Sequence, residues 1–304
     1  MVAELIVMNY KRYRILTALL LLLFLSCAKA SGQDSGRTAN GEQVLRAFQS
    51  SFPDKVSEVA FVDDDWTITA GGQTFFWAEG RLLPEAERKN FASFAPHIFY
   101  YYPSSPRSPD TFSPECIEAI RSRANPRNRR AHRNFSHALH GVLYGGFTRA
   151  EVGRMLERIV FLGHRVTVHR MIVEPLRNVE AEIRKWEGGE AFIASLESVC
   201  GYNWRPIAGT PRISYHSWGL AIDILPRRPG GRAIYWQWER HRNRNWMLIP
   251  LENRWNPPLP VIEAFERQGF IWGGKWLLFD NMHFEYRPEL IEFNRLMASY
   301  NIRI

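Results

Sequence analysis

The chain has 304 residues, of which 45% are hydrophobic, and it includes 11 tryptophans and 19 phenylalanines. A chain of this length and composition is large enough to form its own hydrophobic core. We expect one domain with a smaller companion domain. The formal net charge of +8 favours anionic partners, either nucleic acid or a negatively charged cell envelope.

Residues 1–30 have the form of an export signal. Basic residues between positions 11 and 14 precede the apolar run 15–25, which is too short to span a bilayer comfortably. Two processing sites compete in this segment. Residues 24–27 resemble a loose lipobox, which would make Cys27 the lipidated first residue, whereas residues 28–30 form an Ala-x-Ala site for ordinary cleavage. We therefore expect an exported protein of the periplasm or cell envelope, attached to the membrane through a lipid if Cys27 is modified.

Export favours a component of the cell envelope over nucleic acid as the anionic partner. An exported chain seldom meets nucleic acid, so we expect none to bind. Residues 1–30 carry four basic residues and one acidic residue, which leaves a net charge of about +5 on the rest. Peptidoglycan and anionic lipids are negatively charged, and this charge would steer the protein toward them.

The cysteines agree with an oxidising compartment. If Cys27 is lipidated or removed, Cys116 and Cys200 remain as an even pair, for which we expect a disulfide. The alternative is two buried thiols. Neither cysteine belongs to a closely spaced pair, which argues against a zinc site built from them.

The chain then divides into three further parts. Residues 31–42 are polar and predict a flexible tether. Residues 43–134 form an N-terminal region of unknown role, with a helix at 44–52 and a hairpin of 66–69 and 73–77 around Gly71-Gly72. Aromatic residues at 99–102 close this region, either packed in its core or stacked on sugars, and an Arg- and Pro-rich connector follows to residue 134.

Residues 135–304 predict the larger domain. A capping box at Thr148 and Glu151 opens an amphipathic helix that we expect to end at Gly163. A strand at 165–169, helices at 174–186 and 190–199, and a helix at 257–269 follow. This order predicts an α+β fold: a small antiparallel sheet with flanking helices, preceded by the small mixed N-terminal region.

The most informative segment is Ser214-Tyr215-His216-Ser217-Trp218-Gly219-Leu220-Ala221-Ile222-Asp223. In a strand, Leu220, Ile222 and Ile224 point one way and Asp223 the other. The same alternation recurs near the C-terminus, where His283 and Glu285 share one face. Two imidazoles and one carboxylate suffice for a catalytic zinc, which keeps a fourth position for water.

Taken together, Ser-x-His-x-x-Gly-x-Ala-x-Asp, Trp272-Gly273-Gly274-x-Trp276 and Asp280-x-x-His283-Phe284-Glu285 resemble the M15 family of zinc peptidases. This family includes D-alanyl-D-alanine carboxypeptidases of the VanY type and L-alanyl-D-glutamate endopeptidases. An Asp three residues before the second His resembles the endopeptidase-like branch. The resemblance implies a domain at 135–304 that hydrolyses peptide bonds in peptidoglycan stem peptides.

The resemblance also implies roles for single residues. The zinc ligands would be His216, Asp223 and His283, with Asp280 as the general base. Ser214 would help to hold the substrate, and Glu285 would orient His283 or a substrate amine.

The family's oxyanion arginine is less clearly matched. Arg170 is one candidate, although Val168 and His169 replace the small residues that usually precede this arginine; Arg212 is the other candidate, with substrate binding as its role. The alternative function is a non-catalytic envelope lipoprotein that binds peptidoglycan or a metal on the same fold.

Overall fold

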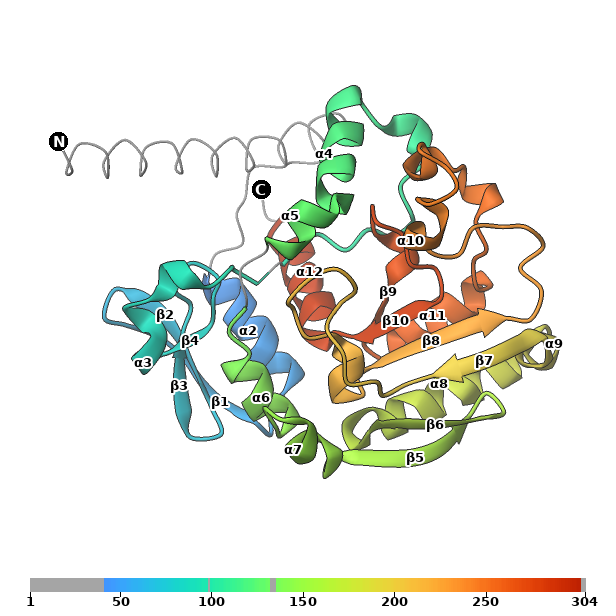
Figure 1. The fold of residues 1–304 in the computed structure, drawn as a ribbon. Coiled ribbons are helices and arrows are strands. Elements are labelled where there is room, and N and C mark those ends of the chain that lie inside the picture. Colours follow the sequence, from blue (N-terminus) through green and yellow to red (C-terminus); the bar gives the residue numbers. More distant parts are fainter. Residues whose placement is uncertain (1–40, 98, 132–134, 302–304) are drawn as a thin grey trace.

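The computed structural model describes residues 41–97, 99–131 and 135–301 (Figure 1). The predicted export signal, Cys27 and most of the predicted tether lie outside these residues. Within the described part, no helix is both long and apolar enough to cross a bilayer.

The architecture is α+β, as predicted. The helices are α2 (Gly41–Ser51), α3 (Glu85–Arg88), α4 (Pro114–Ala124), α5 (Pro126–Arg130), α6 (Ala138–Tyr144), α7 (Arg149–Gly153), α8 (Val173–Lys185), α9 (Gly189–Ser195), α10 (Trp236–Glu239), α11 (Leu259–Arg267) and α12 (Pro288–Asn301). The strands are β1 (Val56–Val62), β2 (Asp65–Ala70), β3 (Gln73–Phe76), β4 (Leu83–Pro84), β5 (Leu156–Phe161), β6 (His164–His169), β7 (Leu196–Cys200), β8 (Ala221–Pro226), β9 (Phe270–Trp272) and β10 (His283–Tyr286).

The N-terminal part is a four-stranded antiparallel meander, β1-β2-β3-β4, covered by α2. The helix and the hairpin of β2 and β3 form where the sequence predicts them. Gly71 and Gly72 make the turn between these strands, and both have positive φ, which glycine adopts at no steric cost. Helix α2 also packs against α12, so the first and last described elements lie side by side (Figure 1).

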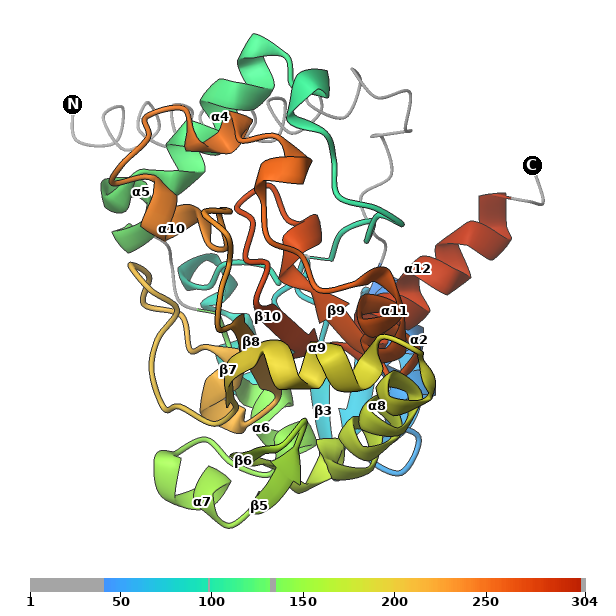
Figure 2. The same ribbon diagram turned by 90° about the vertical axis from the view of Figure 1, so that its right-hand side faces the viewer.

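The central sheet has the order β7-β8-β10-β9, with antiparallel pairs throughout. Helix α11 packs on one face, where Phe265 stacks on Phe284 with ring centroids 3.9 Å apart. Helix α8 lies beside α11 on the same side, and α4, α5 and α10 lie together away from it (Figures 1 and 2). One face of the sheet is thus buried in the main core, and the other is left for polar side chains.

Two helix predictions were wrong in part. The helix from Thr148 ends at Gly153, and its predicted continuation is strand β5, paired with β6. The run Ile159-Val160-Phe161 is β-branched and aromatic, and Leu162 and Gly163 form a tight turn with positive φ at both residues. The helix predicted at 190–199 likewise ends at Ser195, because Leu196–Cys200 pairs with β8.

The predicted connector before residue 134 contains two helices. Its prolines start these helices rather than break them: Ser113 caps α4 and Asn125 caps α5, each followed by a proline at the first helical position. A second hydrophobic cluster joins α4 to the insert at 227–258 and consists of Cys116, Ile120, Ala124, Ala233, Trp236, Trp246, Met247 and Phe279.

Candidate metal centre and active site

A short 3₁₀ turn, Tyr215–Trp218, presents the first candidate ligand. The Ser214 hydroxyl caps this turn by accepting a hydrogen bond from the His216 N–H at 3.3 Å. Gly219 ends the turn with φ 69°, and a Cβ there would lie 2.7 Å from the backbone nitrogen of His169. This glycine is therefore required both by its backbone conformation and by its close neighbour. His216 itself is buried.

The other two ligands face each other across the sheet. His283 on β10 pairs directly with Asp223 on β8. Ile222, Ile224 and Phe284 are fully buried in the core, so the alternating residues Asp223 and His283 point to the opposite face. The two predicted strands therefore place these side chains as the alternation indicates.

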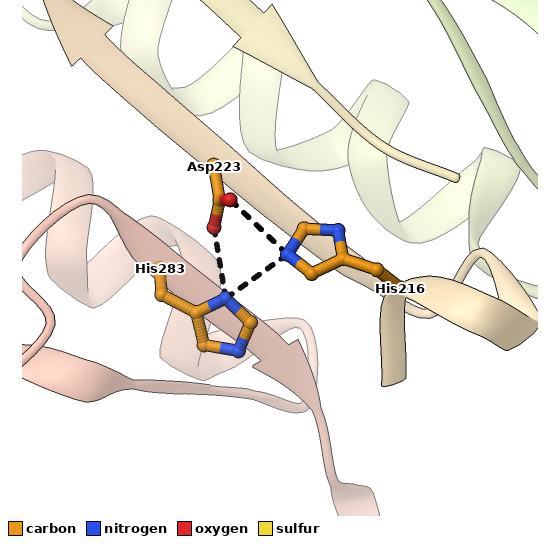
Figure 3. A group of neighbouring side chains, drawn as sticks. All are labelled: His216, Asp223 and His283. Atoms are coloured by element: carbon orange, nitrogen blue, oxygen red, sulfur yellow. Dashed lines mark hydrogen bonds and ion pairs between the residues drawn. The ribbon is translucent and has the colours of Figure 1, made fainter. Parts of the chain in front are cut away.

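The three predicted ligands converge on one point (Figure 3). His216 Nε2 lies 3.3 Å from His283 Nδ1, and Asp223 Oδ2 lies 3.2 Å from His216 Nε2. Asp223 Oδ1 lies 2.8 Å from His283 Nδ1. The edge of a zinc tetrahedron with zinc–nitrogen bonds of 2.0–2.1 Å is about 3.3 Å, and the two histidine nitrogens have this spacing.

Hydrogen bonds on the far side of each imidazole fix its orientation. The His216 Nδ1–H donates to the Gly201 carbonyl over 2.6 Å, and the His283 Nε2–H donates to Glu285 over 3.3 Å. The remaining ring nitrogen of each histidine faces Asp223. Such outer partners select the tautomer and orientation of metal-binding histidines, and Glu285 is placed to do so for His283.

The electrostatics favour a cation at this point. Burial favours the neutral acid, but His216 and His283 outweigh it and hold the pKa of Asp223 well below its usual range. Burial opposes protonation of His283, yet its hydrogen bonds to Asp223 and Glu285 raise its pKa to about 10. The surroundings thus stabilise a positive charge that either a proton or a metal ion can supply.

Asp280 lies beside this group, at the entry to β10. Its N–H donates to the Gly273 carbonyl over 3.0 Å, and its own carbonyl accepts from the His283 N–H over 3.2 Å. Oδ1 is buried and has no hydrogen-bond partner. Burial raises the pKa of Asp280 to about 7, with Asp223 adding to the shift and His283 opposing it. A carboxyl group that titrates near neutrality can both accept and return a proton.

Behind the metal group, a chain of buried charges supports Glu285. Arg287 donates to Glu285 Oε1 over 3.2 Å and also binds Glu289, whose side chain is fully buried. Arg287 could not be predicted from the sequence, because an Arg two residues after a strand-face Glu gives no signal of burial. Trp276 was likewise not predicted as a neighbour of His283, whose ring centroid lies 5.5 Å from its own.

The arginine assignments need one correction. Arg170 is exposed and binds the Arg154 carbonyl, so it does not serve the site. The strand that precedes it ends one residue earlier, at His169, which is buried against the Tyr144 carbonyl. Arg205, which the sequence analysis did not single out, lies within electrostatic reach of Asp280 and lowers its pKa.

Arg212 is better placed than Arg170. Its guanidinium lies 3.8 Å from the ring centroid of Phe135, and its buried Nε has no hydrogen-bond partner. Burial lowers the pKa of Arg212 to about 10, opposed by Glu285. A largely desolvated guanidinium without an ion pair among the described residues is ready to bind an anionic group.

The predicted disulfide is wrong. Cys200 is a free, exposed cysteine at the end of β7. Cys116 is buried instead in the second hydrophobic cluster, with Trp236 and Phe279, away from the main core on which β7 packs. An even number of remaining cysteines is not evidence that their side chains meet.

The fold and the site thus define an α+β protein with a candidate mononuclear metal centre and an adjacent buried carboxyl group. Residues 208–286 match a family model of the M15 peptidases that is described as D-alanyl-D-alanine carboxypeptidase. The peptidoglycan L-alanyl-D-glutamate endopeptidase CwlK of Bacillus subtilis (strain 168) is 38% identical over 76 residues. That alignment covers 25% of this chain and 40% of the relative, well under two thirds of its length.

The N-terminal part has a separate match. Residues 44–99 match a family described only as a domain of unknown function. No solved structure gives a significant match to the chain.

Proposed function

We propose that this protein is a zinc-dependent peptidase that hydrolyses peptide bonds in peptidoglycan stem peptides. The observation that carries the proposal is the convergence of His216, Asp223 and His283 next to buried Asp280, within a segment of the M15 family. The similarity to an endopeptidase of peptidoglycan supports the substrate class.

Zinc would be held by His216 Nε2, Asp223 and His283 Nδ1, the atoms that face one another in the structure. When bound, zinc supplies a Lewis acid that polarises a carbonyl group and makes water easier to deprotonate.

Asp280 would carry the proton through the reaction. Its carboxylate accepts a proton from the attacking water, and the resulting acid gives that proton to the leaving amine nitrogen. One water is consumed, the C–N bond breaks, and a carboxylic acid and an amine result. Arg205, within electrostatic reach of Asp280, would help to balance the negative charge that develops.

Arg212 and Ser214 would bind the substrate. Stem peptides carry free carboxylates, and Arg212 offers a guanidinium without an ion pair among the described residues. The Ser214 hydroxyl accepts from the His216 N–H and keeps its own proton for donation to a substrate carbonyl.

Two bonds compete as the point of cleavage. The family description favours removal of a terminal D-alanine, whereas the Bacillus relative cuts between L-alanine and D-glutamate. Mass spectrometry of muropeptides incubated with the zinc-loaded protein distinguishes these products directly. Bound zinc without either product would favour the non-catalytic binder.

The catalytic role is tested with Asp280→Asn against Asp54→Asn, an exposed aspartate in the N-terminal part. We expect Asp280→Asn to keep its zinc and to lose about 100- to 10,000-fold in hydrolysis, as removal of a general base does. Asp54→Asn should match the wild type. Full activity of Asp280→Asn would remove Asp280 from its role.

The substrate role is tested with Arg212→Gln against Arg170→Gln, which changes an exposed arginine. Two stem peptides are compared, one with a free α-carboxylate and one with an α-carboxamide. A lost charge-assisted hydrogen bond corresponds to about a 10- to 100-fold loss of preference for the carboxylate. Equal preference in both variants would contradict this assignment.

We also propose that the protein acts outside the cytoplasm, in the periplasm or cell envelope. The support is the sequence of residues 1–30, with Cys27 as the point of lipid attachment if it is modified. We propose 43–134 and 135–304 as the two folded parts that follow the tether at 31–42.

A further inference from the structure

An aromatic segment outside the M15 match lies against the peptidase part. We name residues 99–102 the aromatic strap; it begins at residue 99, where the N-terminal domain match ends. Asn294 on α12 holds the backbone of the strap: the Tyr102 N–H donates to its Oδ1 over 2.8 Å, and its Nδ2 donates to the Tyr100 carbonyl over 3.1 Å. The strap is therefore fixed at two points to the last helix.

Phe99 ties the strap to both parts of the molecule. Its ring lies 5.7 Å from that of Phe48 on α2 and 5.9 Å from that of Phe293 on α12. The strap is thus not a free linker between two domains, because its first side chain is packed between their helices.

Tyr102 supports strand β9. Its hydroxyl oxygen accepts the Trp272 N–H over 2.8 Å and its O–H donates to Glu266 over 2.5 Å. Lys275 lies over the Tyr102 ring at 4.5 Å and pairs with the same Glu266 at 2.6 Å. These contacts hold the end of β9, which pairs with β10 through Trp272 and Phe284, next to His283.

Tyr100 reaches still closer to the metal group. Its hydroxyl oxygen accepts the Trp276 indole N–H over 2.8 Å. The Trp276 ring packs at 48° against His283, with centroids 5.5 Å apart. One hydrogen bond from the strap therefore fixes the indole that borders a candidate metal ligand.

We propose that the aromatic strap is a positioning element for the metal centre, in which Tyr100 acts through Trp276 on His283. The peptidase part is then completed by residues that the N-terminal domain delivers. This inference rests on the metal centre of the proposed function, but it does not depend on which peptide bond is cut.

The chain offers a matched control. Tyr101 is the next residue, and its side chain is 57% exposed. Tyr100→Phe and Tyr101→Phe remove the same hydroxyl group from adjacent positions, but only the first leaves the Trp276 N–H without its partner.

The test measures zinc affinity by chelator competition, and the visible absorption spectrum after Co²⁺ substitution, in the full-length protein. Outer partners of metal-binding histidines typically contribute 10- to 100-fold, and Tyr100 lies one residue farther out, so we expect Tyr100→Phe to weaken zinc binding about 3- to 10-fold. The Co²⁺ spectrum should shift, and Tyr101→Phe should behave as the wild type.

A double-mutant cycle separates this role from a loss of general stability. If Tyr100 acts through Trp276, its substitution has no further effect on zinc affinity in a Trp276→Phe background. Additive effects, or equal zinc affinity and spectra for Tyr100→Phe and Tyr101→Phe, would overturn the proposal. Because neither readout needs turnover, a wild type that binds zinc and hydrolyses nothing would contradict the proposed function alone.

Discussion

Replacing Arg287 with methionine should be among the most destabilising single changes in residues 135–301. The side chain is only 12% exposed and pairs with Glu285 and Glu289, which are 13% and 0% exposed. Methionine keeps much of the volume but leaves both carboxylates without their cation. Breaking a buried ion pair from one side costs about 3–5 kcal/mol, because the charge that remains is not compensated.

Helix α12, which begins directly after Arg287, supplies the control. Arg295 pairs with Glu292 at 2.7 Å, but its side chain is 68% exposed. Exposed pairs contribute about 0–1 kcal/mol, so Arg295→Met should change stability by less than about 1 kcal/mol. Urea unfolding of the protein in EDTA, followed by fluorescence and circular dichroism, measures both variants without a contribution from bound metal.

The pH dependence gives a second measure of the same effect. Burial raises the pKa of Glu289, and Arg287 opposes that shift. In Arg287→Met the folded-state pKa of Glu289 rises further above the unfolded value of about 4.3. A raised folded pKa contributes stability below the unfolded pKa and loses it as pH increases, so the penalty relative to wild type should shrink toward pH 4. A penalty below about 1 kcal/mol at pH 7, or one that grows in acid, would refute this reasoning.

Three further outcomes follow from the structure. The His140 ring stacks on that of His97 with centroids 4.8 Å apart and lies edge-on to that of His137 at 6.2 Å, and burial lowers the pKa of His97 to about 3 and of His137 to about 4. Because the unfolded value is about 6.5, stability should be complete above that pH and fall below it by up to about 1.4 kcal/mol per pH unit per histidine; a flat unfolding free energy between pH 6.5 and 4 would contradict this. Gly219→Ala should weaken zinc binding, since its Cβ meets the His169 backbone and displaces the turn that carries His216, whereas Gly230→Ala, with no atom within 4 Å, should not; equal zinc affinities would argue against the constraint. Cys200 should react with a maleimide in the native, unreduced protein, and peptide mass spectrometry locates the label. If Cys200 reacted only after reduction, it would be in a disulfide and this prediction would be wrong.

The sequence predicted the centre of the site well because its signals are local. His216 and Asp223 lie seven residues apart, and the alternation on β8 and β10 determines which side chains share a face. Helix α2 and the β2–β3 hairpin were likewise predicted from short patterns and two glycines. In each case the pattern that indicates the element lies within a few residues, although the pairing of Asp223 with His283 joins strands far apart in the sequence.

Failures occurred where partners distant in sequence decide the outcome. Leu156–Phe161 carries an apolar pattern that suits a helix, but it pairs with β6. The three histidines of the buried group come from two separate parts of the chain, and their spacing in sequence gives no sign that they meet. Arg170 was assigned from a family pattern, and Cys200 from the even number of remaining cysteines. Neither kind of evidence contains distances between side chains.

The direct pairing of Asp223 with His283 has a consequence for how this protein can change. The two residues are held by the ladder between β8 and β10, so the chain that joins the strands does not set their separation. That chain includes the insert at 227–258, whose Trp236 and Trp246 pack in the second hydrophobic cluster with α4. Insertions and deletions there can reshape the surroundings of the centre while the ligands stay in place. A slip of the ladder by one residue would instead turn His283 to the core face and remove the centre altogether.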